Sequence, residues 1–392
     1  MTEDFFAYQA QTSPHPLALK IERAQGSCIY DDRGNSYLDF VAGVSANTLG
    51  HQPARVKKAI NDQLEKYMHV MVYGEFIQSP QVELCKFLAE KLPNNLNCTY
   101  LTNSGTEATE GAIKLAKRIT GRAEIVAAHN AYHGNTQGAM SVCGREEQNR
   151  AYRPLIPGSR FIRFNREADL KSIGPDTAAV ILETIQGGAG FIVPEPGYLK
   201  KVKERCEKVG ALLILDEIQS GIGRTGKFFG FMNHDVEPDI LITGKGLGGG
   251  MPIGAFISSQ KNMSVFTENP KLGHITTFGG HPVIAAAALA TLKELYDGSH
   301  MLKVHEKEKL IRKHLRHELI VEIRGQGLML ALILEDSEKV NYLIHQSLKE
   351  GLILFWLLYE PRAARITPPL NISDSDLLRG CQIILQILDQ IK

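Results

Sequence analysis

The sequence predicts an α/β protein that has a large domain, with a mostly parallel sheet between helices, and a smaller α+β domain. Two observations carry this prediction. The middle of the chain alternates short apolar segments with helical patterns, which is the order expected of repeated βαβ units. The chain also has 392 residues, whereas a single hydrophobic core stops growing beyond about 250–300 residues.

The composition is typical of a globular protein with small-molecule partners. Apolar residues make up 43% and charged residues 22% of the chain, and both fractions are ordinary. A net charge of +1 argues against nucleic-acid or membrane binding. No apolar run approaches the roughly 18 residues of a membrane-spanning helix, and the acidic start does not resemble a signal peptide. The six scattered cysteines lack a C-x-x-C pair, so we expect a cytoplasmic protein without a metal site.

The expected elements follow in chain order. Residues 27–44 contain two alternating segments joined by a turn at 32–35, which predicts a hairpin. The large domain should then hold strands within 97–105, 122–130, 177–188, 211–219, 238–249 and 252–260, with helices at 106–120, 197–210 and 281–298.

The last hundred residues predict the smaller domain. A strand is expected at 327–334, a helix at 337–351 and an extended segment at 365–370. Ser373 and Asp376 fit a capping box at the start of the last helix. That helix has one apolar stripe, formed by Leu377, Leu378, Cys381, Ile384, Leu385, Leu388 and Ile391. We expect an N-terminal segment at 1–50 that joins the small domain, a large domain at 51–290 and the small domain at 291–392.

Polar residues directly follow four of the expected strands. They are the turn Ser104-Gly105-Thr106 and the side chains of Glu183, Asp216 and Lys245. In open parallel sheets, ligands bind beyond the carboxyl ends of the strands. Each feature alone has a plainer explanation, since Ser104 suits an ordinary helix N-cap and most lysines are exposed. Together they supply an anion site, a carboxylate and an amine, which are the groups that pyridoxal phosphate requires.

Residues 220–230, "SGIGRTGKFFG", also match two nucleotide-binding patterns. Neither match is convincing. Phe228 stands where a phosphate-binding loop needs Ser or Thr for magnesium. A second G-x-G-x-x-G surrounds Lys245, and the chain has 36 glycines, so such matches arise by chance. We expect these glycines to form a turn.

Seven motifs occur in the order found in class III aminotransferases, which the chain resembles from about Phe40 to Leu370. They are "SGTEATEGAIKLAK", "AYHGNT", "ETIQGGAGFIVP", "LILDEIQSGIGRTG", "ITGKGLGGGMPIG", "TTFGGHP" and "RITPPL". This family includes the acetylornithine, ornithine and 4-aminobutyrate aminotransferases. The resemblance implies fold type I, pyridoxal 5'-phosphate as the cofactor and a homodimer with sites at the subunit interface.

The resemblance also implies roles for the matching residues. Lys245 is expected to form the Schiff base with the cofactor and to move a proton at the substrate carbon, while Asp216 pairs with the ring nitrogen. Gly105 and Thr106, in the turn with Ser104, are expected to hold the phosphate. The other expected cofactor contacts are Gln219 near the ring hydroxyl, Ile218 and Tyr132 on the two ring faces, and Thr277 at the phosphate of the neighbouring subunit. Core packing is the plainer explanation for Ile218 alone, and His133 is expected to position its loop.

Two charged residues are expected to bind the substrate. Arg365 matches the family arginine that holds the substrate α-carboxylate. Glu183 is expected to pair with Arg365 when no such carboxylate is bound, so that one pocket serves two substrates. Asn135 and Gly188 depart from the family pattern, because relatives commonly carry Arg and Glu there. We therefore expect a non-standard donor pocket, without strict specificity for acetylornithine or ornithine.

The resulting prediction is an aminotransferase that moves an amino group by ping-pong from an amino acid or ω-amine to a 2-oxo acid, with 2-oxoglutarate as the expected acceptor. The alternatives are an aminomutase, which needs no added 2-oxo acid, and a decarboxylating transaminase, which releases carbon dioxide. A binding or regulatory homologue without catalysis is the alternative from another class, and the presence of Lys245, Asp216 and Arg365 argues against it.

Overall fold

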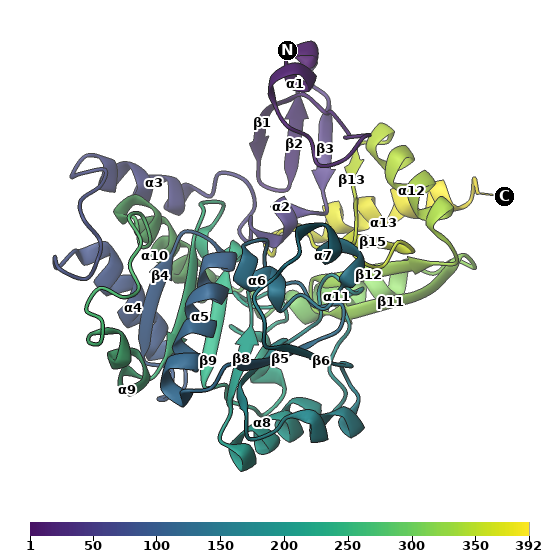
Figure 1. Ribbon diagram of the computed structural model, residues 1–392. Helices are drawn as coiled ribbons and strands as arrows, with labels where there is room; N and C mark the ends of the chain where they lie inside the picture. Colours follow the sequence, from purple (N-terminus) through teal and green to yellow (C-terminus); the bar gives the residue numbers. More distant parts are fainter. Residues whose placement is uncertain (392) are drawn as a thin grey trace.

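The computed structural model describes residues 1–391, and a seven-stranded sheet lies at its centre (Figure 1). Its strand order is β4-β10-β9-β8-β7-β5-β6. The paired strands among β5 to β9 run parallel, while β10 runs antiparallel to both β4 and β9. The expected mostly parallel sheet is therefore confirmed. The strands are β4 (Cys98–Thr102), β5 (Glu124–Ala128), β6 (Ser159–Ile162), β7 (Thr177–Glu183), β8 (Leu212–Asp216), β9 (Ile240–Gly244) and β10 (Gly254–Ser258).

Helices bury both faces of this sheet. On β7, Ala179 and Ile181 pack on one face with the helix α5 (Gly105–Thr120), while Val180 and Leu182 pack on the other with α8 (Tyr198–Val209). Because successive strand residues point to opposite faces, a continuous apolar run fits a sheet covered on both sides. The long helix α10 (Pro282–Asp297) packs against α3 (Ala54–Leu64) and α4 (Ser79–Lys91).

The N-terminal segment forms a second sheet that ends on a strand from the other end of the chain. Its order is β1-β2-β3-β13, with β1 (Ile21–Gln25), β2 (Cys28–Asp31), β3 (Ser36–Asp39) and β13 (Leu352–Ile353). The expected hairpin is confirmed, and Asp31 closes its turn by accepting the backbone N–H groups of Arg33 and Asn35. In the parallel β3–β13 pair, Leu38 lies opposite Leu352.

The C-terminal region contains a third sheet in the order β11-β12-β15-β14. It combines β11 (Ile320–Gln326), β12 (Met329–Leu334), β15 (Ala363–Ile366) and β14 (Phe355–Trp356) with α11 (Val304–His314), α12 (Ser337–Lys349) and α13 (Asp374–Leu388). Ser373 caps α13, since its Oγ accepts from the N–H of Asp376 at 3.0 Å. The second half of the expected capping box differs, because the Asp376 carboxylate accepts the Ser373 hydroxyl instead of its backbone N–H.

The division at residues 50 and 290 remains a proposal. The β3–β13 pair supports an N-terminal segment that joins the small domain, whereas the second boundary falls inside α10. The shorter helices are α1 (Thr2–Tyr8), α2 (Ala42–Ser45), α6 (Gln137–Ser141), α7 (Glu146–Asn149) and α9 (Gln260–Met263).

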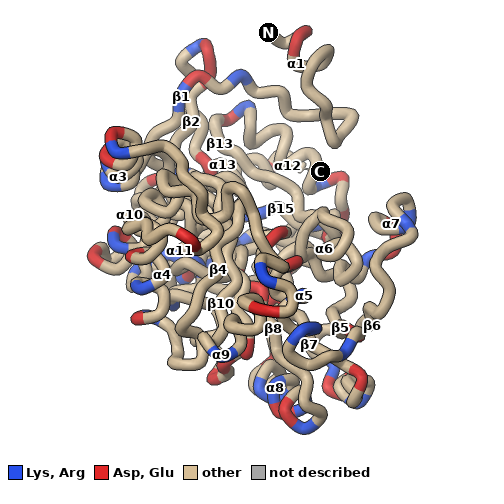
Figure 2. Tube along the Cα trace, turned by 60° about the vertical axis from the view of Figure 1, so that its left-hand side comes forward, with Lys and Arg blue, Asp and Glu red and all other residues tan. Residues whose placement is uncertain are grey.

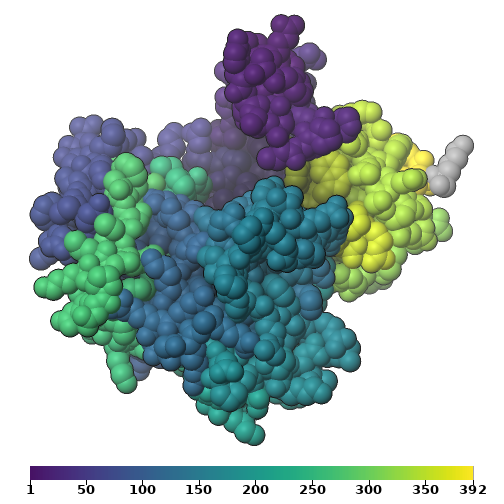
Figure 3. All heavy atoms as spheres, viewed as in Figure 1, coloured from purple at the N-terminus to yellow at the C-terminus, as the bar shows by residue number. Residues whose placement is uncertain are grey.

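The surface has two visible features. Acidic and basic residues are interspersed along the chain (Figure 2), and the N-terminal residues project from the rest of the molecule (Figure 3). The helix α1 within this projection buries no residue. Among the helices of residues 1–391, we find none with the length and apolar character that crossing a bilayer requires.

Candidate active site

Side chains at the carboxyl ends of β7, β8 and β9 meet in one cavity of about 630 Å³. We call it the Lys245 cavity. It also receives residues from the start of α5, from the loop after β5 and from the C-terminal sheet. Its lining consists of Val44, Gly105, Thr106, Tyr132, His133, Gly134, Asn135, Glu183, Ile185, Gly188, Asp216, Ile218, Gln219, Ser220, Lys245, Phe355, Trp356, Leu357, Leu358 and Arg365. The structure thus brings together most of the predicted site residues, although Ser104 and Thr277 do not line this cavity.

Asp216, at the end of β8, is held in place by two partners. Its Oδ2 lies 2.7 Å from Nδ1 of His133, and its Oδ1 accepts the N–H of Ile218 at 3.0 Å. Both His133 and Asp216 are buried. Burial alone would lower the pKa of His133, but the hydrogen bond and charge of Asp216 outweigh burial and raise it. His133 therefore supports a negative charge on Asp216, a contact that its expected role in the loop did not include.

Lys245 follows β9 and is the first residue of a 3₁₀ turn. Its backbone is left-handed, with a φ of 42°, which is unusual for a residue other than glycine. Burial, together with the charge of the nearby Arg365, lowers the pKa of its amine to about 8, against the opposing effects of Asp216 and Glu183. A lowered pKa makes the amine a nucleophile near neutral pH. The side chain of Thr48 packs closely against the next residue, Gly246, because a Cβ at Gly246 would lie 2.3 Å from Oγ1 of Thr48.

The N-terminus of α5 faces the same cavity through Gly105 and Thr106. The first N–H groups of a helix have no partner within it and favour an anion. Ser104 acts as the N-cap, and its Oγ accepts from the N–H of Glu107 at 3.4 Å. Gly105 has a packing reason as well, because a Cβ there would lie 2.6 Å from Cδ1 of Ile218. The glycine thus makes room for Ile218 in addition to any anion.

Two residues from the N-terminal segment contribute to the Lys245 cavity, one as lining and one through a hydrogen bond to a lining residue. Val44 lines it, and Ser45 Oγ accepts from the side-chain amide of Gln219 at 3.3 Å. Both have left-handed backbones, with φ values of 61° and 68°. Tyr132 and Ile218, the expected partners of the two ring faces, also line the cavity. The direction of both side chains depends on these backbone angles, which the sequence pattern does not reveal.

Glu183 and Arg365 line the cavity but do not form the expected ion pair. The two carboxylate oxygens of Glu183 accept the N–H groups of Gly187 at 2.9 Å and Tyr132 at 3.1 Å. Arg365 is buried, and its Nε and Nη1 have no hydrogen-bond partner within residues 1–391. Burial raises the pKa of Glu183 to about 7 and lowers that of Arg365 to about 10. The pair is absent because backbone N–H groups already hold the carboxylate.

The two departures from the family pattern also lie in the lining. Asn135 contributes a neutral side chain, and Gly188 contributes none. The space beside Gly188 is filled by Tyr359, whose Cδ2 would lie 2.9 Å from a Cβ at that position. Tyr359 is anchored there, since its N–H donates to the carbonyl of Gly188 at 2.8 Å.

Thr277 lies apart from the Lys245 cavity. It is exposed and lines a separate hollow of about 330 Å³ with Glu107 and His274. The glycines of residues 221–226 form a turn, as expected, with φ values of 82° at Gly223 and 85° at Gly226. An α-helix does not follow this turn directly, so the strand–turn–helix arrangement of a nucleotide site is not formed within this described segment.

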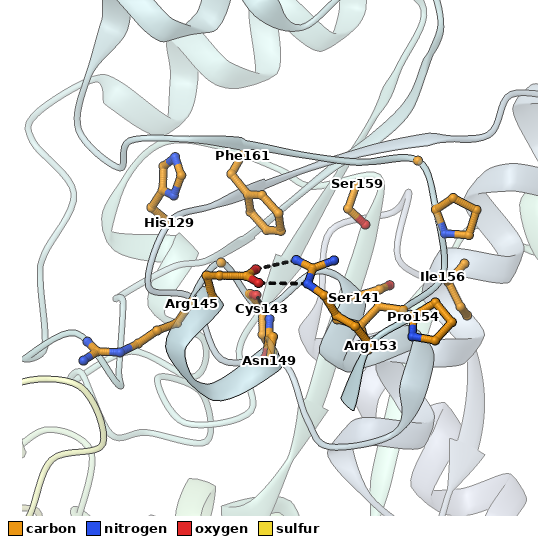
Figure 4. Close-up of a pocket in the computed structure, with 15 residues that line it drawn as sticks. His129, Ser141, Cys143, Arg145, Asn149, Arg153, Pro154, Ile156, Ser159 and Phe161 are labelled. Atoms are coloured by element: carbon orange, nitrogen blue, oxygen red, sulfur yellow. Dashed lines mark hydrogen bonds and ion pairs between the residues drawn. The ribbon is translucent and has the colours of Figure 1, made fainter. Parts of the chain in front are cut away.

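A second cavity of about 700 Å³ is lined by His129 and by residues between 141 and 161 (Figure 4). Cys143 lines it, and the same residue accepts the N–H of His133 through its sulfur at 3.1 Å. Arg153 forms two hydrogen bonds to Glu146 there. None of the predicted site residues lines this second cavity, whereas most of them line the Lys245 cavity. We therefore assign the chemistry to the Lys245 cavity.

The Lys245 cavity fits pyridoxal phosphate on three counts. A buried amine with a lowered pKa lies in the same space as a carboxylate held by a histidine. A helix N-terminus faces that space for an anion. A buried guanidinium without a partner in the described chain is free for a substrate carboxylate.

Comparison with known proteins identifies the family. The family model for class III aminotransferases matches residues 8–388. The chain is a class III aminotransferase. It therefore depends on pyridoxal phosphate and moves an amino group from an amino donor to a 2-oxo acid. This confirms the family, the fold type, the reaction and the cofactor that the motifs predicted.

Three proteins illustrate what this aminotransferase resembles. An acetylornithine aminotransferase from Methanopyrus kandleri is 39% identical over 322 residues, which cover 81% of each chain. An ornithine aminotransferase from Toxoplasma gondii is 31% identical with a TM-score of 0.92, covering 100% of this chain and 95% of the other. An ω-transaminase from Pseudomonas jessenii is 26% identical with a TM-score of 0.92, covering 100% and 98%.

Sequence reasoning missed one wall of the site. Phe355 and Trp356 of β14, with Leu357 and Leu358 after it, line the Lys245 cavity from the C-terminal sheet. The apolar run at 352–358 was the available signal, but its first part packs in the core and its last four residues line the cavity. Leu354 is buried in the core whereas Phe355 is 41% exposed, and periodicity alone does not say which face meets a ligand.

Proposed function

We propose that the aminotransferase performs both half-reactions in the Lys245 cavity, with Lys245, Asp216 and Arg365 as its main working residues. The observation that carries this proposal is the meeting of a nucleophilic amine, a supported carboxylate and a free guanidinium in one cavity. Bound pyridoxal phosphate supplies an electron sink that makes the hydrogen on the amine-bearing carbon acidic. Lys245 would hold the cofactor through its amine, and the same amine would accept this proton from the substrate carbon and return it.

Asp216 would place its negative charge at the ring nitrogen of the cofactor. His133 and the N–H of Ile218 fix the carboxylate, so little reorganisation is needed during the reaction. Gln219, held by Ser45, would face the ring hydroxyl, and Ile218 and Tyr132 would contact the ring faces. His133 is a positioning residue in this proposal, because it acts through Asp216.

The phosphate would bind at the start of α5, on the N–H groups of Gly105 and Thr106, with Ser104 capping that helix. Thr277 would reach the phosphate of a neighbouring subunit in a homodimer. Its exposure and its distance from the cavity of its own chain support this role. The exposed apolar side chains of Phe278 and Ile275 next to it support a buried subunit interface in the assembly.

The substrates would be an amino acid or ω-amine donor and a 2-oxo acid acceptor, for which we propose 2-oxoglutarate. Arg365 would bind the carboxylate next to the reacting carbon, because a guanidinium binds a carboxylate through two hydrogen bonds. Glu183 would support the wall formed by Tyr132 and Gly187. All six cysteines are free thiols, which supports a cytoplasmic location.

The visible absorption spectrum of the protein with pyridoxal phosphate tests this proposal. We expect a yellow band that is lost in Lys245→Ala and that bleaches when a suitable amino donor is added. Addition of a 2-oxo acid should restore the band. The absence of a lysine-dependent band, or its failure to bleach with any amine, would overturn the proposal.

A further inference from the structure

Arg365 lacks a charged partner in the cavity, and this constrains the donor. Arg365 is 7% exposed, and the carbon of its guanidinium lies 5.9 Å from the centre of the Phe191 ring. A buried cation without a partner is unfavourable, so a ligand that supplies a carboxylate gains the full value of the pairing.

The two carboxylates of the cavity are already committed elsewhere. Glu183 accepts two backbone N–H groups, and Asp216 accepts from His133 and Ile218. Turning either one towards Arg365 would leave buried N–H groups or a buried histidine unpaired. Neither carboxylate therefore acts as a movable partner that neutralises Arg365 when the substrate has no carboxylate nearby.

Besides Glu183 and Asp216, position 188 is a third place in the cavity lining where a side chain could carry a carboxylate, and it is a glycine. Gly188 lines the same cavity as Arg365 but has no side chain, and Tyr359 occupies the space that a side chain would need. Tyr359 is fixed by its hydrogen bond to Gly188 and by Arg145, whose guanidinium lies 5.0 Å from the ring centre. The lining of the Lys245 cavity thus has no acidic side chain available to cover Arg365.

The placement of Arg365 near Lys245 determines where a donor should carry its carboxylate. Arg365 lies close enough to Lys245 for its charge to influence the Lys245 amine. A donor amine that replaces Lys245 therefore brings a carboxylate on the same carbon towards Arg365. The lining also includes the apolar side chains of Phe355, Trp356 and Leu358, and Asn135 adds no charge.

We propose that the amino donor is an α-amino acid, and that ω-amines are poor donors because they leave Arg365 unpaired. This inference rests on the proposed function and deepens it by naming the donor class. The responsible features are the committed carboxylates of Glu183 and Asp216 and the lack of a side chain at Gly188, where the ring of Tyr359 fills the space.

Isomeric donors provide the first test with the cofactor-loaded protein. L-norvaline and 5-aminopentanoate have the same formula, but the carboxylate lies next to the amine in the first and far from it in the second. We expect kcat/KM for bleaching of the cofactor band to be at least about a hundredfold higher for L-norvaline. Butylamine, which lacks the carboxylate, should be as poor as 5-aminopentanoate. Equal or better reaction with 5-aminopentanoate would overturn the inference while leaving the proposed function intact.

Binding without turnover provides a second readout. Trp356 is the single tryptophan of the chain and lines the cavity, so its fluorescence reports ligand binding. Pentanoate should change this fluorescence at concentrations at least about tenfold lower than pentanol does. Arg365→Gln should remove that difference. A pentanoate response that is unaltered in Arg365→Gln would contradict the role given to this residue.

A carboxylate introduced at position 188 tests whether this position sets the donor class. The double variant Gly188→Glu, Tyr359→Ala introduces a carboxylate into the space that Tyr359 now fills. Its neutral control is Gly188→Gln, Tyr359→Ala. We expect the Glu variant to lower the preference for L-norvaline over 5-aminopentanoate at least about tenfold relative to the Gln variant. Equal preferences in two folded variants would show that charge at this position does not set the donor class.

Failure of the inference and failure of the proposed function give different results. If no donor of either type bleaches a lysine-dependent band, the proposed function fails. If both isomers bleach it equally, only the donor class is wrong.

Discussion

Asp216 illustrates how a single charge depends on its neighbours. Its carboxylate is buried between His133 and the N–H of Ile218. Asp216→Asn keeps the shape but removes the charge, so we expect kcat to fall about a thousandfold, as for the loss of other preorganised electrostatic groups. Steady-state kinetics with saturating cofactor measures this effect. A variant that folds, binds the cofactor and keeps its kcat would contradict the proposed role.

Lys245 predicts a pH dependence of stability in the cofactor-free protein. Its pKa is about 8 in the folded chain, against an ordinary value of 10.5. Below pH 8 the lysine is protonated in both states, and the folded state bears a buried charge. Between these two pKa values the unfolded chain binds the extra proton, so the free energy of unfolding rises with pH. The full change corresponds to about 3 kcal/mol.

Lys245→Met serves as the matched comparison for this prediction. Methionine has a similar length and no charge, so the variant should be more stable than the wild type at neutral pH. The difference should shrink as pH rises through the window, and urea unfolding at several pH values measures it. Parallel stability curves for the two proteins would mean that Lys245 keeps an ordinary pKa.

Residue roles were only partly predictable from the sequence. Asp216 and Lys245 were predictable, because each directly follows an apolar strand and the ends of parallel strands meet at one edge. The absence of the expected Glu183–Arg365 ion pair was not predictable. The direction of the Glu183 carboxylate depends on two backbone N–H groups that only the folded loop brings near. The support of Asp216 by His133 likewise joins residues that are far apart in sequence.

At the scale of elements, the packing of α5 on the sheet connects stability to the anion site. Gly111 of α5 faces Phe256 of β10, and a Cβ at Gly111 would lie 2.3 Å from Cε1 of that ring. The helix therefore lies closer to the sheet than an alanine would allow. Because α5 begins at Gly105, a shift of the helix would also move the N–H groups that face the cavity.

Gly111→Ala should accordingly destabilise the protein by about 1–3 kcal/mol through overpacking. Helix propensity alone predicts the opposite, a gain of about 1 kcal/mol. The free energy of unfolding in urea decides between these outcomes. Lys117→Ala, on the last turn of the same helix, should change it by less than about 0.5 kcal/mol and serves as the control.

The elements themselves were easier to predict than their pairing. Apolar runs and glycine stops located β7, β8, β9 and α8 because each run is buried on both faces or ends at a left-handed glycine such as Gly210. The reversal of β10 between β4 and β9 has no such local signal. The two-residue strands β13 and β14 are too short to leave a period in the sequence.

At the scale of the whole molecule, the β3–β13 pair joins the first and last parts of the chain. Leu38 of β3 is fully buried and packs in the same core as Leu352 and Phe40. Leu38→Ala should lower the free energy of unfolding by about 3 kcal/mol, the usual result of truncating a buried leucine.

Circular dichroism during urea unfolding measures this loss. Leu64→Ala is a suitable control, since Leu64 is 42% exposed and its truncation should change stability by less than about 1 kcal/mol. If Leu38→Ala is no more harmful than Leu64→Ala, the N-terminal sheet contributes little to the stability of the rest.

The same strand pair has a consequence for synthesis on the ribosome. The strands β1 to β3 emerge first, yet the partner of β3 lies in the last tenth or so of the chain. Throughout translation the edge of β3 therefore has unpaired N–H and C=O groups next to the apolar Leu38, a combination that invites pairing with other chains. A newly made aminotransferase chain thus depends on prompt synthesis of β13, or on a chaperone, to protect a strand that it made much earlier.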